Sequence, residues 1–231
     1  MAHDHQRRDF VKLAIAAGTP LALGAVPTPV LGQSDPTQQE ELSFFEVVRS
    51  RRSVRRFQPT PVPDEHVTQI LDAARLAPTS GNQQPWKFLV VRDRGLVDAM
   101  MDACIDRALD ARRARGLTVS AEVTDAVRQS LEGYFSAPVY IVVLTDNESR
   151  YPTYNHWDGP LAAGYLMLAA RALGYGTVFI TDSIPDDVTR EVLEIPDRFT
   201  RVCITPIGVP ETWPDSPAKK ELGEFIVYDR F

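Results

Sequence analysis

Cysteine and histidine are scarce in this sequence, which limits the metal and disulfide chemistry open to it. Its 231 residues include two cysteines and four histidines, of which His3 and His5 fall at the extreme N-terminus. Two cysteines are too few for a disulfide framework or a metal cluster, so no metal site is expected. We interpret Cys104 and Cys203 as buried apolar residues, although an oxidising compartment would permit a bridge between them.

Net positive charge, an unbroken apolar run and a dinucleotide fingerprint are absent as well. The formal net charge of −6 makes the chain a poor general nucleic-acid binder, and no nucleic-acid partner is expected. The apolar stretch 13–31 is broken by prolines and glycines, so it is ill suited to cross a membrane as a helix. Gly174 and Gly176 follow an expected helix and precede an expected strand, the reverse of the order that a G-x-G-x-x-G turn requires.

The N-terminus carries two adjacent arginines in RRDFVKLAIAAG, residues 7–18. Arg7 and Arg8 ahead of a mild apolar run resemble a twin-arginine export signal, which the twin-arginine translocation machinery reads and which carries folded proteins. We expect residues 1–32 to be this signal, with the protein exported to the periplasm, and residues 33–42 to be a polar linker. A membrane anchor or a disordered leader is the alternative. The remaining residues 43–231 fit one domain, because domains commonly have about 100–200 residues.

Hydrophobic periodicity predicts the secondary structure of this domain. Helices are expected at 43–51, 64–77, 94–114, 121–135, 159–174 and 185–193, and strands at 87–93, 137–146, 175–182 and 201–209, with the weakly alternating tail 224–231 as a candidate further strand. Ser43 with Glu46 forms a capping-box pattern, and Asp64 is the expected cap of the second helix. The consecutive helices in the middle interrupt a regular βαβ rhythm, which favours a sheet covered by helices.

Five arginines stand within eight residues in RSRRSVRRF, residues 49–57, of an acidic chain. Arg51, Arg52, Ser53 and Arg55 place bidentate donors and a hydroxyl in one turn, a combination suited to a phosphate monoester. A solvated helix end is the simpler interpretation, because cations favour a helix C-terminus. An RNA-binding stretch is a third, weakened by the lack of interleaved aromatic residues.

A second polar constellation is the loop APTSGNQQPW, residues 77–86. Two prolines bracket hydroxyl and amide side chains and a glycine, so the loop is stiff and its backbone is accessible. From these residues alone it could be any polar turn.

The stretch that joins these two constellations, SRRSVRRFQPTPVPDEHVTQILDAARLAPTSGNQQPWKFLVV, closely resembles the opening of the nitroreductase family of FMN-dependent enzymes. GPLAAGYLMLAARALGYGTVFI, TPIGVPE and KKELGEFIVYD resemble later elements of that family in the same order. The resemblance implies an α+β fold, with a central, mostly antiparallel sheet flanked by helices. It also implies an intertwined homodimer with two FMN molecules at the subunit interface.

The resemblance also implies roles for individual residues. Arg51, Arg52, Ser53 and Arg55 would hold the phosphate and ribityl end, and Lys219, with the adjacent Lys220, would close on the phosphate. Pro78, Thr79, Ser80, Gly81 and Asn82 would lie against the isoalloxazine, across the interface. Phe179, Ile180, Thr181 and Asp182 fall where the family offers backbone N–H groups to the flavin N5 and O4 edge. No side chain is identified as a catalytic acid or base.

Two departures from the family pattern bear on the chemistry. Many members have Gly-Gly where this chain has Thr181-Asp182, and an anionic Asp182 near the flavin would disfavour the anionic reduced form. The Glu/Tyr/Lys lid of the family's deiodinase branch has no match between residues 93 and 135, which argues against dehalogenation.

The expected function is therefore that of an FMN-dependent oxidoreductase with ping-pong transfer of hydride or electrons through N5. Its substrate would be a small organic molecule such as a nitroaromatic, a quinone or an enone. The electron donor would be NAD(P)H if the protein is cytoplasmic, and a membrane or protein donor if it is exported. The alternative is a non-catalytic flavin-binding or electron-carrier protein.

Overall fold

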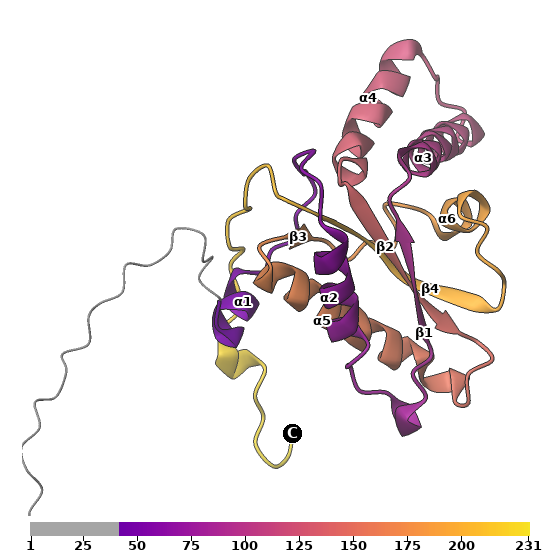
Figure 1. Cartoon of the computed structure of the whole chain (residues 1–231). Helices are drawn as coiled ribbons and strands as arrows, with labels where there is room; N and C mark the ends of the chain where they lie inside the picture. Colours follow the sequence, from indigo (N-terminus) through magenta and orange to yellow (C-terminus); the bar gives the residue numbers. More distant parts are fainter. Residues whose placement is uncertain (1–41) are drawn as a thin grey trace, which may run out of the picture. The chain divides into compact units, whose positions relative to one another are not determined.

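A four-stranded antiparallel sheet organises the chain (Figure 1). The computed structural model describes residues 42–231, so the expected export signal and nearly all of the expected linker lie outside the described residues. The strands are β1 (Trp86–Val91), β2 (Val139–Asp146), β3 (Gly176–Thr177) and β4 (Phe199–Gly208), in the spatial order β1-β2-β4-β3. The antiparallel α+β fold predicted from the sequence is confirmed.

Helices cover both faces of this sheet (Figure 1). The helices are α1 (Phe44–Ser50), α2 (Asp64–Ala74), α3 (Arg94–Ala114), α4 (Ala121–Glu132), α5 (Asn155–Ala172) and α6 (Asp186–Val192). Buried side chains of α2 and α5 pack on one face, and those of α3 and α6 pack on the other. No helix within residues 42–231 is long and apolar enough to cross a membrane.

The central strand β2 contributes to both hydrophobic clusters of the core, one on each face of the sheet. Its side chains alternate between the two hydrophobic clusters, with Val139, Ile141 and Val143 on the α2/α5 side and Tyr140, Val142 and Leu144 on the α3/α6 side. A strand that is buried on both faces has a continuous apolar sequence. The run VYIVVLTD predicts such a strand here.

The two cysteines lie on opposite faces of the sheet. Cys104 belongs to the α3/α6 cluster and Cys203 to the α2/α5 cluster, and both are free and buried. Burial raises the pKa of Cys104 to about 11 and that of Cys203 to about 12. The interpretation of both as core residues is confirmed, and the bridge between them does not form.

Several boundaries differ from the prediction. Asp64 is the first residue of α2 rather than its cap, because Pro63 occupies the cap position and the Asp64 carboxylate pairs with Arg92 at 2.7 Å. Helix α5 begins at Asn155, four residues earlier than predicted. The buried Asn155 side chain donates to the carbonyl of Asp146 at 2.8 Å, and this tertiary contact fixes the first turn despite Pro160.

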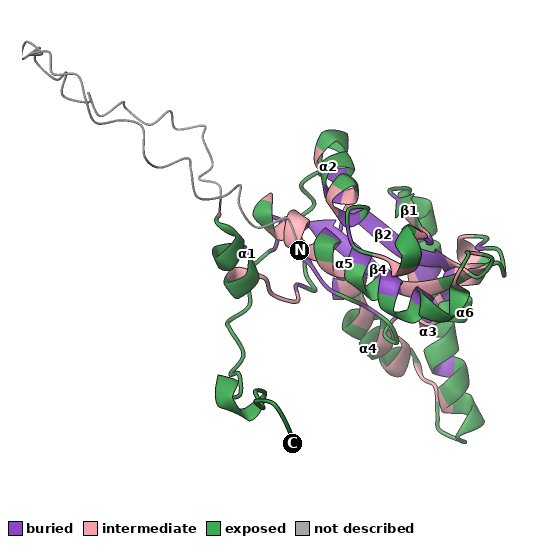
Figure 2. Ribbon diagram, turned by 90° about the horizontal axis from the view of Figure 1, so that it is seen from below, coloured by how far each residue is buried: buried purple, intermediate pink, exposed green. Residues whose placement is uncertain are grey.

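Two expected strands, 175–182 and the tail 224–231, are not formed as predicted. Only Gly176–Thr177 forms a strand, with a single further bridge from Ile180 to Ile204, because the chain turns Phe179 out to solvent between them. The tail forms no strand in the described structure. The C-terminal segment, residues 211–231, is exposed throughout (Figure 2).

Candidate functional site

The arginine turn, residues 51–55, is anchored to the edge of the sheet. Helix α1 ends at Ser50, after a capping box formed by Ser43 and Glu46 as predicted. The chain then runs beside β3, where the Val54 N–H donates to the carbonyl of Thr177 at 2.9 Å. Val54 and Phe57 are buried in the core, so the side chains between them are left at the surface. These two anchors were not recognised in the sequence, although their apolar character in a run of arginines was a usable signal.

The arginine turn forms one wall of a cavity of about 780 Å³, which we call the cationic pocket. It is lined by Val48, Arg49, Arg51, Arg52, Ser53, Arg55, Leu168, Pro214, Asp215, Ser216, Pro217 and Lys219. The structure thus brings Lys219 to the four predicted phosphate residues from the far end of the chain. Lys220 does not line the pocket, and its Nζ lies 3.7 Å from the Glu224 carboxylate.

The basic side chains of this pocket form no ion pair within the described chain, although Asp215 also lines it. Among residues 42–231, no ion pair involves an arginine between positions 49 and 56. Arg52 instead donates to the carbonyls of Arg49 and Arg51, at 2.6 and 2.8 Å. Guanidinium groups without carboxylate partners, together with a hydroxyl and a lysine, form a donor set that suits a phosphate dianion.

The polar loop 78–82 lies at the other end of α5. Gly81 has φ +56° and Asn82 has φ +54°, both in the left-handed region. A Cβ at Gly81 would stand 2.6 Å from Cε2 of the Tyr151 ring, so glycine is required here both by conformation and by space. Gly81 and Asn82 are exposed, and Thr79 and Ser80 are partly exposed.

A buried network holds this loop from beneath. Asp158 of α5, which is 2% exposed, accepts from the Ser80 N–H at 3.1 Å and from the Gln83 side-chain amide at 2.7 Å. Gln83 in turn accepts from the N–H of Tyr151 at 2.7 Å. The role of Asp158 could not be predicted from the sequence, because its partners lie some 75 positions away and no local pattern connects them.

The segment 179–182 continues from β3 along the sheet edge. Ile180 is a core residue whose N–H and carbonyl both pair with Ile204, at 3.1 and 3.0 Å, so its N–H is not free to meet a flavin. The Ile180 N–H is thus already used within the sheet, and a role of this residue at the flavin stays a prediction. Phe179, Thr181 and Asp182 are exposed. Their role at the flavin N5 and O4 edge stays a prediction.

Arg201 of β4 fixes the course of this segment. Its side chain is only 5% exposed and donates to the carbonyls of Thr181 and Ile184, at 2.6 and 2.7 Å. Burial lowers the pKa of Arg201, while the carboxylates of Asp186 and Asp182 act in the opposite direction. The sequence held no signal for this residue, which lies inside an apolar strand.

The two constellations lie well apart within one chain. Asp158 beneath the polar loop and Leu168 beside the cationic pocket lie toward opposite ends of α5 (Figure 1). At 1.5 Å per residue, the helix separates these positions by about 15 Å.

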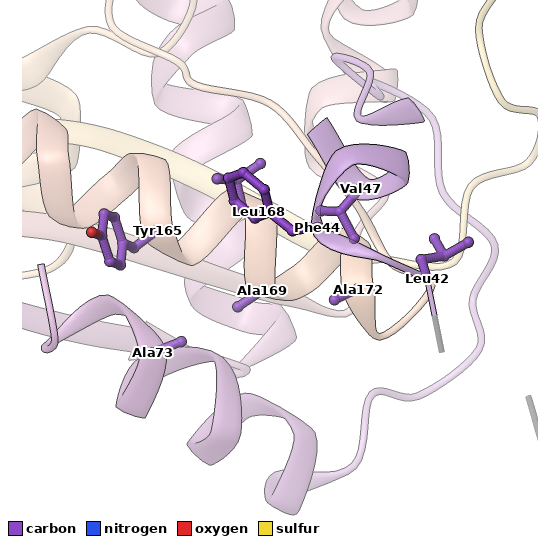
Figure 3. Close-up of a pocket in the computed structure, with 8 residues that line it drawn as sticks. All are labelled: Leu42, Phe44, Val47, Ala73, Tyr165, Leu168, Ala169 and Ala172. Carbon is purple, nitrogen blue, oxygen red and sulfur yellow. The ribbon is translucent and has the colours of Figure 1, made fainter. Parts of the chain in front are cut away.

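An apolar groove adjoins the cationic pocket between α1, α2 and α5 (Figure 3). The apolar groove has a volume of about 430 Å³ and is lined by Leu42, Phe44, Val47, Ala73, Tyr165, Leu168, Ala169 and Ala172. Leu168 lines both cavities. In the described chain Phe44 is 65% exposed and Tyr165 is 42% exposed, so much of this surface meets water.

Comparison with known proteins places these features in a family. Residues 48–209 match the sequence model of the nitroreductase family. The 4-nitrobenzoate reductase of Pseudomonas putida is 33% identical over 193 residues, covering 71% of this chain and 84% of the relative. The iodotyrosine deiodinase of Thermotoga neapolitana is 30% identical over 195 residues, covering 81% and 98%.

A solved structure has the same fold. The crystal structure of oxidized iodotyrosine deiodinase bound to FMN and 3-iodo-L-tyrosine superposes with a TM-score of 0.65 at 24% identity, covering 82% of this chain and 100% of the other. The match of the family model spans the arginine turn, the polar loop and all four strands. This chain belongs to the nitroreductase family.

Proposed function

We propose that this protein is an FMN-dependent oxidoreductase that reduces or oxidises a small organic substrate, with a nitroaromatic, a quinone or an enone as the favoured classes. The observation that carries the proposal is the cationic pocket, in which Arg51, Arg55 and Lys219 converge without carboxylate partners. Membership of the nitroreductase family supports the reaction class, and similarity to a 4-nitrobenzoate reductase supports the nitroaromatic class.

The residues of this chain bind and orient the cofactor. Bound FMN supplies the redox chemistry, passing a hydride or two single electrons through its N5. The arginine turn and Lys219 hold the phosphate, and Ser53 offers a hydroxyl beside them. Thr181 and Asp182 would lie at the N5 and O4 edge of the bound flavin, on a segment that Arg201 keeps in place.

The polar loop belongs to the site of a second copy of the chain. Its distance from the cationic pocket of its own chain fits a flavin whose phosphate end and ring end contact different protomers. Exposed apolar side chains on α1 and α5, such as Phe45, Trp157 and Leu161, give the two copies a surface to share. The apolar groove of Figure 3 adds to that surface.

Dehalogenation is a weaker candidate despite the deiodinase relative. The segment 93–135, which carries α3 and α4, contains no lysine. The basic member of the Glu/Tyr/Lys lid that we associate with deiodinases is therefore missing from this stretch.

Turnover separates an enzyme from a flavin carrier. The purified protein is expected to be yellow, and its flavin, bleached anaerobically by a reductant, should be reoxidised by a nitroaromatic, a quinone or an enone. The electron donor is sought by screening NADH, NADPH, a quinol and dithionite. This screen identifies the direction in which the enzyme passes electrons to or from its substrate. Flavin that bleaches with dithionite but is reoxidised by none of these acceptors would favour the carrier instead.

We further propose that the protein is exported after folding. FMN is expected to be bound without a covalent link, so a chain threaded outward unfolded would arrive without it. A ligand that binds only the native state also stabilises it, which favours loading before transport. An exported enzyme would need a membrane or protein electron donor in place of NAD(P)H.

Replacing Arg7 and Arg8 by lysine tests the export proposal. The change keeps the charge but removes the guanidinium fork that a receptor would read. The variant is expected to accumulate in the cytoplasm as yellow, active protein, measured by cell fractionation and flavin absorbance. A variant with both arginines intact and Lys12→Arg serves as a control. Equal export of the double-lysine variant and the parent would contradict a twin-arginine signal.

A further inference from the structure

Arg171, near the end of α5, touches both walls of the cationic pocket without lining it. Its Nε donates to the Ser50 hydroxyl at 3.0 Å, and Ser50 is the residue before the arginine turn. Its guanidinium carbon lies 4.3 Å from the centroid of the Trp213 ring. Trp213 begins the segment 213–219, whose residues from Pro214 to Lys219 form the opposite wall of the pocket. One side chain therefore joins the wall with the arginines to the wall with the lysine.

The segment 213–219 has few other attachments. The chain is tied to the body at Glu211, whose N–H donates to the carbonyl of Arg56 at 3.2 Å. From residue 212 to residue 219 the described structure has no hydrogen bond, and the segment is exposed throughout. The stacking of Trp213 on Arg171 therefore ties the start of this segment to α5, in addition to the residues of the segment that line the cationic pocket.

Arg171 occupies a position where a cation is unfavourable. Burial and the charge of Arg52 both lower the pKa of Arg171. Its hydroxyl and indole partners carry no negative charge, so the cation–π contact with Trp213 attracts the guanidinium without neutralising it. An anion bound in the cationic pocket would offset the repulsion between Arg171 and Arg52, so a site for a dianion makes this added cation favourable.

We propose that Arg171 and Trp213 form a latch that holds the segment 213–219 over the cationic pocket, so that Lys219 meets the phosphate of the flavin. Both are positioning residues that act through Lys219. This inference rests on the proposed function, because it takes the phosphate group of FMN as the ligand of the pocket.

Comparing FMN with riboflavin tests the latch, because riboflavin lacks only the phosphate. The full chain is titrated with each flavin, and the ratio of the two dissociation constants is measured for the parent and for Trp213→Leu, Arg171→Lys and Lys219→Gln. Trp213→Leu and Arg171→Lys are expected to weaken FMN binding about three- to tenfold, the range of a partly exposed cation–π contact. Lys219→Gln should weaken it at least as much, and each variant should leave riboflavin binding unchanged. Trp213→Phe keeps an aromatic face and should retain most of the affinity for FMN.

Two comparisons separate the latch from simpler effects. Arg171→Lys keeps the charge but loses the stacked plane and the Nε donor, so parent-like FMN affinity in this variant would overturn the latch. Trp213→Leu combined with Lys219→Gln should be no weaker than Lys219→Gln alone, and additive losses would also overturn it. Arg128→Met, which removes an exposed arginine of α4, is the charge control and should leave the ratio unchanged.

The same titrations distinguish failure of the latch from failure of the proposed function. If the parent prefers FMN to riboflavin but the latch variants keep that preference, the latch is wrong and the phosphate site stands. If the parent binds both flavins equally, the cationic pocket does not hold the phosphate, and the latch fails with it. Unchanged riboflavin affinity in each variant shows that the flavin site remains folded.

Discussion

Replacing Arg51 and Arg55 by alanine is expected to give a folded protein that purifies without colour. Both side chains line the cationic pocket, and neither has a carboxylate partner in the described chain. Each charge-assisted hydrogen bond to a phosphate contributes about 1.5–3 kcal/mol. Two such losses, taken at the lower end because the side chains are partly solvated, weaken FMN binding by roughly a hundredfold or more.

The fold should survive this double change. Arg55 donates only a long bond of 3.4 Å to the carbonyl of Ser53, while the anchors Val54 and Phe57 remain in the core. The measurement is the ratio of absorbance at 450 nm to absorbance at 280 nm, together with thermal unfolding. Arg107→Ala with Arg128→Ala removes the same charge from exposed sites on α3 and α4 and should keep full colour. Full FMN occupancy in the Arg51/Arg55 variant would contradict the assignment of the pocket.

Local patterns predicted much of the fold but little of the packing around the site. Helix α3 matches its predicted range because the polar and apolar residues of 94–114 follow a helical period and Asp93 caps it. Helix α5 was predicted to begin too late, because its apolar run begins at residue 159 and the tertiary contact of Asn155 cannot be seen in the sequence. Strand β3 was predicted too long, because the sequence does not reveal that Phe179 turns outward.

Some residues of the candidate site were predicted from the sequence and others were not. The arginines and Lys219 were expected to meet because a resemblance placed them, and the structure brings them into one cavity. Asp158, Arg201 and Arg171 were not predicted. Each acts through partners at least 12 positions away along the chain, such as the bond between Arg171 and Ser50, so its importance depends on the fold and not on its neighbours in sequence.

Replacing Gly81 by valine is expected to remove FMN as completely as the loss of the two arginines. Valine at φ +56° is strongly disfavoured, because a β-branched side chain clashes with its own backbone in the left-handed region. Its Cβ would also stand 2.6 Å from the Tyr151 ring, so either the ring or the loop above Asp158 must move. The measurement is flavin content, with thermal unfolding as the check on folding.

Gly116 provides a matched control for this change. It has φ +71° in the turn after α3, and a Cβ there meets nothing within 4 Å. Gly116→Val therefore carries similar backbone strain, about 1–3 kcal/mol, without displacing a neighbour or touching the polar loop. We expect both valine variants to be less stable than the parent and only Gly81→Val to lose FMN. Equal flavin content in the two variants would mean that the loop does not contact the cofactor.

Combining the two defects in one dimer tests whether the site is shared between protomers. One protomer carries Arg51→Ala with Arg55→Ala, the other carries Gly81→Val, and the two are co-expressed with different tags and purified as a mixed dimer. If each flavin takes its arginine turn from one protomer and its polar loop from the other, one site has both defects and the second has none. The mixed dimer then binds one FMN, where the parent dimer binds two and each variant alone binds none. If instead each protomer builds its own site, both sites of the mixed dimer have one defect and it stays colourless.

Failure to isolate any mixed dimer, with the parent sedimenting as a flavin-loaded monomer, would refute the homodimer itself.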